Sequence, residues 1–165
     1  MSAVQNMKQK ILFLDDNEEF VTMMAENFTE NYECFTYVDP KEALKKLRAD
    51  QQICLVISDY VMPLINGSEF LKLLRADGNL VPIIFVTGEL DQDLALNALR
   101  MGAAGLLEKP ISVQELEEAI NRVLYIETRK KNYYTALSEE KPFVPDKILG
   151  LMFVKMAESA KKKTS

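Results

Sequence analysis

Five polar residues that could do chemistry stand at or just after the ends of short apolar runs. They are Asp15, Asp16, Asp59, Thr87 and Lys109. Carboxylates bind hard divalent cations and can act as nucleophiles, a hydroxyl group can donate a hydrogen bond, and an ammonium group can neutralise an anion. Because the runs themselves are almost wholly apolar, the combination predicts one site rather than unrelated surface groups.

Each of these residues also has a purely structural explanation. Asp16 could cap the first expected helix together with Glu19. Asp59 could order a turn, and Thr87 is of a residue type common in strands. Taken singly, none of them identifies a site, so the prediction depends on their shared position at the strand ends.

The elements that must position these residues are visible as a repeating pattern. Short apolar runs alternate five times with amphipathic segments, which is typical of consecutive βα units that build a parallel sheet covered on both faces. The runs are nearly continuous, which favours strands buried on both faces. In such a sheet, ligands bind outside the carboxyl ends of the strands, where the five residues stand. We expect strands over 11–14, 32–38, 54–58, 83–87 and 105–107, and helices over 17–29, 40–49, 67–76, 91–101 and 113–128.

Helix boundaries carry recognisable signals. Three expected starts pair a capping side chain with a glutamate three residues on, and two expected ends carry a glycine. These signals are Asp39-Pro40 with Glu42, Asn66 with Glu69, Ser112 with Glu115, and the glycines Gly78 and Gly102.

The composition is that of a globular protein with one full core. The chain has 165 residues, of which 48% are hydrophobic and 27% are charged. No apolar run approaches the roughly 18 residues of a membrane span, and no cleavable leader is recognisable, so we expect a cytoplasmic protein. Cys34 and Cys54 lie in apolar runs without CxxC spacing, and we expect them to be buried and to have no redox role.

Charge divides the chain into two parts. Residues 1–127 hold 11 Lys+Arg and 21 Asp+Glu, a net of −10, and residues 128–165 hold 9 and 4, a net of +5. We expect a main domain over 1–127 and an extension over 128–165 with a different role. Histidine is absent, which removes the usual general base, the commonest metal ligand and any phosphohistidine carrier from this polypeptide.

Four motifs carry a resemblance to a known family. They are LDD at 14–16, SDYVMPLING at 58–67, VTG at 86–88 and EKP at 108–110. In this order and at these separations, they resemble the receiver domains of bacterial response regulators over about residues 8–127. The resemblance implies a flavodoxin-like, doubly wound α/β fold with the strand order 2-1-3-4-5 and five helices, as in chemotaxis receivers. It also implies a partner that donates the phosphoryl group, either a histidine kinase or a histidine phosphotransfer protein.

The resemblance makes Asp59 the phosphoacceptor. Its carboxylate would attack phosphorus and form an aspartyl phosphate without a general base, since the nucleophile is already ionised. Lys109 would reach the transferred oxygens across two strand spacings, about 10 Å, and the resemblance implies a cis bond to Pro110 that aims its ammonium group. Thr87 would donate a hydrogen bond to a phosphoryl oxygen.

The same strand order brings three carboxylates together. At about 5 Å, each pair would repel by roughly 3 kcal/mol at an effective dielectric constant of 20, and one lysine cannot offset this. A divalent cation would, and all-oxygen ligands favour Mg²⁺, with Mn²⁺ as a substitute. The resemblance implies that Asp16 and Asp59 bind the cation directly with the backbone carbonyl of Val61, and that Asp15 acts mainly through metal-bound water.

One position departs from the family pattern. Three residues before the lysine, family members usually carry Tyr or Phe as a switch that moves with the threonine, and this chain has Leu106. Leucine has neither a hydroxyl group nor an aromatic face. We therefore expect phosphorylation to persist, while the structural response is smaller or follows other residues.

These residues are compatible with three functions. The leading one is a phosphoacceptor without a separate catalytic output domain, hence not an enzyme, which signals through contact with an unidentified protein target. The alternative is a phosphorylation-independent adaptor or docking module, which Leu106 favours and the complete acidic site opposes. A hydrolase or phosphotransferase with an aspartyl nucleophile is the weakest, because the DxD arrangement of such enzymes is absent: Asp59 is followed by Tyr60 and Val61.

The extension at 128–165 is too short for a winged-helix output domain and has no helix-turn-helix pattern, which argues against direct DNA binding. Within it, residues 146–160 are expected to form an amphipathic helix, followed by lysines at 161–163. This helix could pack on its own domain, bind a partner, or form a homodimer. The lysine run is too short to predict membrane association.

Overall fold

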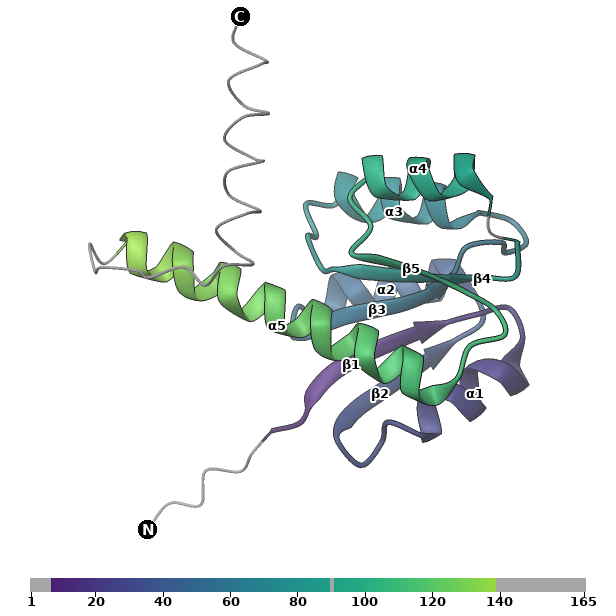
Figure 1. Ribbon diagram of the computed structural model, residues 1–165, viewed down its shortest axis with the longest axis horizontal. Coiled ribbons are helices and arrows are strands. Elements are labelled where there is room, and N and C mark those ends of the chain that lie inside the picture. The colour runs from purple at the N-terminus through teal and green to yellow at the C-terminus, as the bar shows by residue number, and fades with distance from the viewer. Residues whose placement is uncertain (1–6, 90, 139–165) are drawn as a thin grey trace, which may run out of the picture. The chain divides into compact units, whose positions relative to one another are not determined.

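The computed structural model describes residues 7–89 and 91–138. Five parallel strands form one sheet in the order β2-β1-β3-β4-β5, and helices connect them (Figure 1). This confirms the doubly wound α/β fold and the expected strand order. The strands are β1 (Gln9–Leu14), β2 (Tyr32–Tyr37), β3 (Ile53–Asp59), β4 (Ile83–Thr87) and β5 (Gly105–Glu108), and the helices are α1 (Glu18–Glu26), α2 (Pro40–Ala49), α3 (Gly67–Ala76), α4 (Gln92–Arg100) and α5 (Val113–Ser138).

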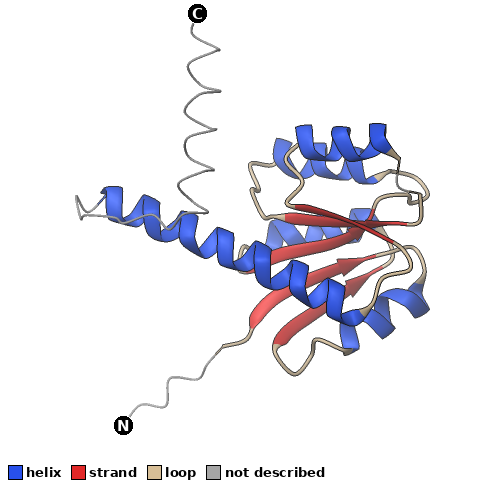
Figure 2. Cartoon of the chain, in the orientation of Figure 1, coloured by secondary structure: helices blue, strands red, loops and turns tan. Residues whose placement is uncertain are grey.

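Helices cover both faces of the sheet (Figure 2). Helix α1 and the first turns of α5 lie on one face, and α2, α3 and α4 lie on the other. On the second face, Val56 and Phe85 from the strands join Leu47 and Leu74 from the helices in one buried cluster. Each side chain of this size contributes about 1.5–3 kcal/mol when it leaves water. This core fixes the strands whose ends carry the polar residues.

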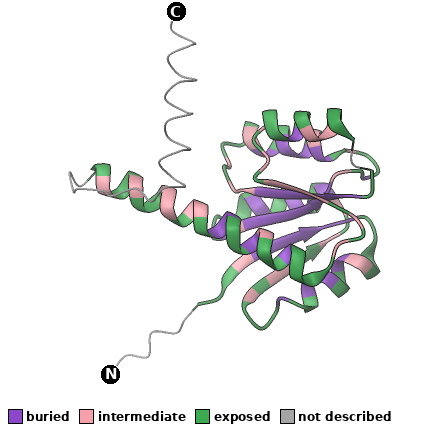
Figure 3. Cartoon of the chain, viewed as in Figure 1, coloured by how far each residue is buried: buried purple, intermediate pink, exposed green. Residues whose placement is uncertain are grey.

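Burial is deepest in the central strands (Figure 3). The strands β1, β3 and β4 are buried over most of their length, whereas β2 and β5 are partly exposed because an edge strand has a neighbour on one side only. Cys34 on edge strand β2 and Cys54 near the start of β3 are free and only partly buried. The prediction that both cysteines are buried was therefore wrong, since each is only partly buried. Even partial burial raises the pKa of the Cys34 thiol to about 11.

The strand register brings the carboxyl ends of β1, β3, β4 and β5 to one edge of the sheet. Leu14, the last residue of β1, pairs with Ser58, and Asp59 pairs with Val86 one position later. The last residues of β4 and β5 are likewise paired with each other. Residues that end these strands or follow them directly must therefore lie close together.

The structure shows which residue caps the start of α1. Asn17, and not Asp16, caps α1, since the Asn17 side-chain oxygen accepts a hydrogen bond from the Phe20 N–H at 3.0 Å. Capping is thus excluded as the role of Asp16. The remaining boundary signals are confirmed: Asp39, Asn66 and Ser112 at helix starts, and Gly78 and Gly102, with φ angles of +73° and +84°, at helix ends.

Helix α5 is longer than the sequence pattern predicted. It continues past residue 128 to Ser138, through the expected boundary between main domain and extension. A first compact unit ends at Val123, and a second unit begins at Leu124. The helix expected at 146–160 and the lysines at 161–163 lie outside the described residues. None of the helices within the described ranges combines the length and apolarity needed to span a membrane.

Candidate functional site

Three carboxylates converge at the carboxyl edge of the sheet. Asp15 and Asp16 directly follow β1, and Asp59 is the last residue of β3. One oxygen from each of the three lies within 4.8 Å of the others. Asp15 and Asp59 are buried, at 4% and 7% exposure, whereas Asp16 is exposed. The cluster therefore has a buried floor and one side open to solvent.

Lys109 reaches this cluster from β5. Its Nζ atom donates a hydrogen bond to Asp15 Oδ2 at 2.7 Å and lies 3.6 Å from Asp59 Oδ2. Its backbone N–H donates to the carbonyl oxygen of Thr87 at 2.8 Å, which ties the lysine to the end of β4. The Lys109–Pro110 bond is cis, as the resemblance implied. The long side chain of Lys109 thus reaches from the end of β5 to the carboxylates at the ends of β1 and β3, as the strand order predicted.

Backbone N–H groups hold both buried carboxylates. The N–H of Asn17 donates to Asp15 Oδ1 at 2.9 Å, and the N–H of Val61 donates to Asp59 Oδ1 at 3.4 Å. The Ser58 hydroxyl donates to the carbonyl oxygen of Asp59 at 2.8 Å, which fixes the backbone there. These bonds leave other lone pairs of each carboxylate free to bind a ligand.

The site carries more negative charge than its lysine offsets. Burial raises the pKa of the Asp59 carboxyl group, Lys109 opposes this shift, and the nearby Asp15 carboxylate adds to it. The net result is a raised pKa, so the ionised form of Asp59 is less stable here than that of an aspartate in water. Oxygen ligands, like-charge crowding and an open side together fit a hard divalent cation such as Mg²⁺.

Thr87 is the last residue of β4 and is fully buried. Its Oγ1 accepts a hydrogen bond from the backbone N–H of Glu89 at 3.2 Å. Position 106, two residues into β5, pairs with Phe85 of β4. Leu106 is partly buried there and packs against the core cluster, so an aliphatic side chain fills the position where the family usually has an aromatic ring.

The loop after β3 is held by a contact that sequence reasoning missed. The Gly67 N–H donates to the carbonyl oxygen of Tyr60 at 2.7 Å. A Cβ atom at Gly67 would lie 2.7 Å from Phe85 Cε1 and 2.8 Å from Tyr60 Cδ2, closer than real Cβ atoms come. Only glycine fits here without a shift of these rings, which allows the close turn of the loop that carries Val61. The glycine was visible within the motif at 58–67, but nothing in the sequence showed what it would touch.

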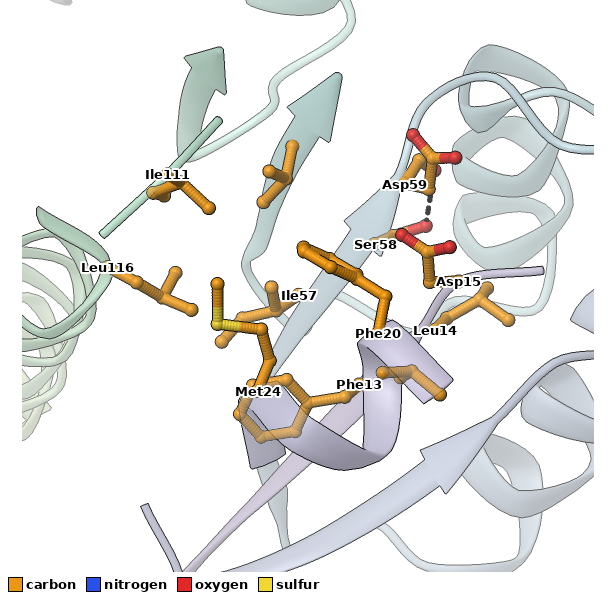
Figure 4. Close-up of a pocket in the computed structure, with 12 residues that line it drawn as sticks. Phe13, Leu14, Asp15, Phe20, Met24, Ile57, Ser58, Asp59, Ile111 and Leu116 are labelled. Atoms are coloured by element: carbon orange, nitrogen blue, oxygen red, sulfur yellow. Dashed lines mark hydrogen bonds between the residues drawn. The ribbon is translucent and has the colours of Figure 1, made fainter. Parts of the chain in front are cut away.

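A small cavity of about 20 Å³ adjoins the carboxylates (Figure 4). Asp15 and Asp59 line its polar end, and apolar side chains such as Phe13 and Met24 line the rest. Phe20 also lines it, and the Lys109 Nζ atom lies 4.5 Å from the centroid of the Phe20 ring. Sequence reasoning missed Phe20, because nothing in the sequence showed that the first turn of α1 would bring its ring close to Lys109.

Known proteins match this chain over its receiver-like part. The family model for the response regulator receiver domain matches residues 11–121. The alkaline phosphatase synthesis transcriptional regulatory protein PhoP of Bacillus subtilis is 31% identical over 119 residues, which cover 72% of this chain and 49% of that protein. Hybrid signal transduction histidine kinase D of Dictyostelium discoideum is 32% identical over 126 residues, or 75% of this chain and 8% of that protein. The chain thus spans about half or less of each of these relatives.

Solved structures agree. A chemotaxis response regulator of Vibrio cholerae is 30% identical with a TM-score of 0.64, and the match covers 70% of this chain and 98% of that one. The receiver domain of a Luxo repressor protein from Vibrio parahaemolyticus has a TM-score of 0.71 over 77% of this chain and 98% of that one; at 20% identity it supports the fold alone. The chain therefore belongs to the response regulator receiver domain family of two-component signal transduction.

Proposed function

We propose that this receiver accepts a phosphoryl group on Asp59 in a Mg²⁺-dependent reaction and signals by protein–protein contact. The observation that carries the proposal is the grouping of Asp59 with Asp15 and Asp16 within 4.8 Å, beside the ammonium group of Lys109. A buried carboxylate with a raised pKa is costly to keep ionised. A functional site can carry this cost, because a bound cation would offset the charge of the carboxylate and phosphorylation would consume it.

Asp16, Asp59 and the backbone carbonyl of Val61 would hold the cation directly, with Mn²⁺ able to replace Mg²⁺. Asp15 would act mainly through bound water. The exposure of Asp16 supports this division, since an exposed carboxylate can turn toward a cation, whereas Asp15 is buried and bonded to Lys109. When bound, the cation would stabilise negative charge on the transferred phosphoryl oxygens.

The reaction needs only the groups at this edge of the sheet and a donor. A carboxylate oxygen of Asp59 would attack the phosphorus atom, while the bond from phosphorus to the donor's leaving atom breaks and the leaving group keeps the electron pair. The ammonium group of Lys109 would contact one transferred oxygen and the hydroxyl of Thr87 another. Thr87 ends β4, the strand paired with that of Asp59, and Lys109 follows β5 with its Nζ atom 3.6 Å from Asp59 Oδ2, which supports these roles.

The donor is proposed to be a histidine kinase or a histidine phosphotransfer protein. The chain itself contains no histidine, and one relative is named a hybrid signal transduction histidine kinase. Phosphorylation would shift the population between two conformations and thereby change the affinity for a protein target.

The test of this proposal is incubation of the full chain with acetyl phosphate and Mg²⁺, followed by intact-mass measurement. Wild type should gain one phosphoryl group, and both Asp59→Asn and a sample with EDTA should gain none. Asp93→Asn is a matched control, because it removes an exposed α4 carboxylate of the same size. Equal uptake by wild type and the Asp59 variant would overturn the assignment.

A second candidate, a docking module that works without phosphorylation, rests on Leu106. Leu106 is aliphatic and packs against the core, so the chain lacks at this position the aromatic ring that in the family moves inward when the threonine moves toward the phosphoryl group. A pull-down from lysate with and without beryllium fluoride, which mimics the phosphoryl group, separates the two functions. Targets held equally under both conditions and by Asp59→Asn would favour the docking module, whereas targets held only with the mimic would favour the phosphoacceptor.

A further inference from the structure

Phe20 on α1 lies beside the ammonium group that the proposed chemistry uses. The Nζ atom of Lys109 is 4.5 Å from the centroid of the Phe20 ring. Phe20 is partly buried and lines the small cavity that adjoins Asp15 and Asp59 (Figure 4). At this distance a cation is attracted to the electron-rich face of an aromatic ring.

The ring is placed by the same residue that holds Asp15. Asn17 caps α1 by accepting a hydrogen bond from the Phe20 N–H at 3.0 Å, and its own N–H donates to Asp15 Oδ1 at 2.9 Å. One residue thus links the backbone of Phe20 to a carboxylate of the cluster. The ring position is therefore set by the turn after β1 and not only by apolar packing.

The neighbours of the Lys109 ammonium group differ in charge. Asp15 at 2.7 Å and Asp59 at 3.6 Å are carboxylates, and both are groups that a bound cation or phosphorylation would change. The Phe20 ring carries no net charge, so it neither serves as a ligand of the divalent cation nor strongly repels an incoming phosphoryl group. It can therefore retain the ammonium group while the carboxylates release it.

We propose that Phe20 is a positioning residue that keeps the Lys109 ammonium group at the phosphoacceptor through a cation–π contact. This inference rests on the proposed function, because it assigns Phe20 a role in that same reaction. Phe20→Leu, which keeps an apolar side chain but removes the ring face, should slow phosphorylation by acetyl phosphate about fivefold, which corresponds to about 1 kcal/mol. Phe20→Tyr, which keeps the face, should react at close to the wild-type rate.

A matched control exists elsewhere in the chain. The Phe35 ring also contacts a lysine, with Lys46 Nζ 4.0 Å from its centroid, and it too is partly buried. Phe35→Leu removes a contact of the same kind outside the site. It should leave the phosphorylation rate unchanged, and thermal unfolding of each variant shows whether the fold is retained.

The experiment measures initial rates with acetyl phosphate and Mg²⁺ on full chains, and the proton resonances of the Lys109 ε-methylene group without metal. The Leu variant should react more slowly, and its Lys109 resonance should move downfield as the shielding ring is lost. A wild-type rate in Phe20→Leu, or an equally slow Phe20→Tyr, overturns the positioning role. An unshifted Lys109 resonance overturns the ring contact, whereas a wild-type chain that takes up no phosphoryl group overturns the proposed function itself.

Discussion

Replacement of Asp59 by asparagine is expected to stabilise the metal-free protein while it abolishes phosphorylation. The Asp59 carboxylate is 7% exposed, and its pKa is raised chiefly by burial. Asparagine has nearly the same shape but no charge to desolvate. Lys109 is not left without a partner by this change, because it keeps its shorter contact with Asp15 at 2.7 Å.

The magnitude follows from the distances in the site. At an effective dielectric constant of 20, an Asp15 oxygen within 4.8 Å repels Asp59 by about 3.5 kcal/mol or more, and Lys109 at 3.6 Å attracts it by about 4.6 kcal/mol. These terms nearly cancel, so the desolvation of a buried ion, which costs several kcal/mol, decides the sign. We expect the Asn variant to gain about 2 kcal/mol in free energy of unfolding, or about 5 °C in Tm for a chain of this length.

The gain should depend on pH in a defined direction. Because the folded-state pKa of Asp59 is raised, its protonation favours the folded state. The corresponding stability is fully present below the ordinary aspartate pKa of about 3.9 and is lost as pH rises through the folded-state pKa. The difference between variant and wild type should therefore be largest near neutral pH and shrink as the pH falls toward 4.

Urea unfolding followed by circular dichroism, in EDTA and in excess Mg²⁺, measures these differences. Asp93→Asn, an exposed change of the same charge, should stay within about 0.5 kcal/mol of wild type. Mg²⁺ should raise the stability of wild type but not of Asp59→Asn, because binding to the folded state alone is stabilising. An Asn variant that is clearly less stable than wild type in EDTA would refute the reasoning. It would mean that the Asp59 carboxylate is already stabilised by its neighbours without a divalent cation.

Three further changes test other parts of the site. Lys109→Gln should slow phosphorylation about 100-fold or more while Mg²⁺ binds at least as tightly in calorimetry, since a cation that competes for Asp15 is removed; weaker Mg²⁺ binding would contradict this. Gly67→Ala should cost about 1–3 kcal/mol in thermal unfolding, because its Cβ atom would lie 2.7 Å from Phe85 Cε1; an unchanged Tm would argue against the close contact. Leu106→Tyr should enlarge the chemical-shift changes on α4, β5 and α5 upon phosphorylation, and comparable changes in both chains would count against a weakened switch.

The helices and strands were predictable because the hydrophobic pattern and the capping residues are local signals, whereas the strand order came from the resemblance that the four motifs carry. Nearly continuous apolar runs identify the central strands, and capping residues such as Asn66 and Ser112 mark helix starts to within a residue. The end of α5 was missed, because no glycine or proline follows residue 128 closely and the apolar pattern weakens there. The partial exposure of Cys34 was missed because its apolar run favours burial, although the expected strand order already placed this strand at the edge of the sheet.

The site was predictable in its residues but not in its internal contacts. Five strand-end residues could be named because parallel strands present their carboxyl ends at one edge. That Lys109 bonds Asp15 more closely than Asp59 depends on side-chain conformations that no motif encodes. The contact with Phe20 depends on the direction in which α1 leaves β1, which Asn17 sets through its capping bonds.

Identification of the modified residue tests the central claim most directly. The full chain is treated with acetyl phosphate in Mg²⁺ or in EDTA and then with sodium borohydride, whose hydride reduces an aspartyl phosphate to homoserine and releases phosphate. Peptide mass spectrometry should find homoserine at position 59 in the Mg²⁺ sample and unmodified aspartate there in EDTA. Homoserine at another aspartate, or equal conversion at position 59 without the cation, would contradict the account.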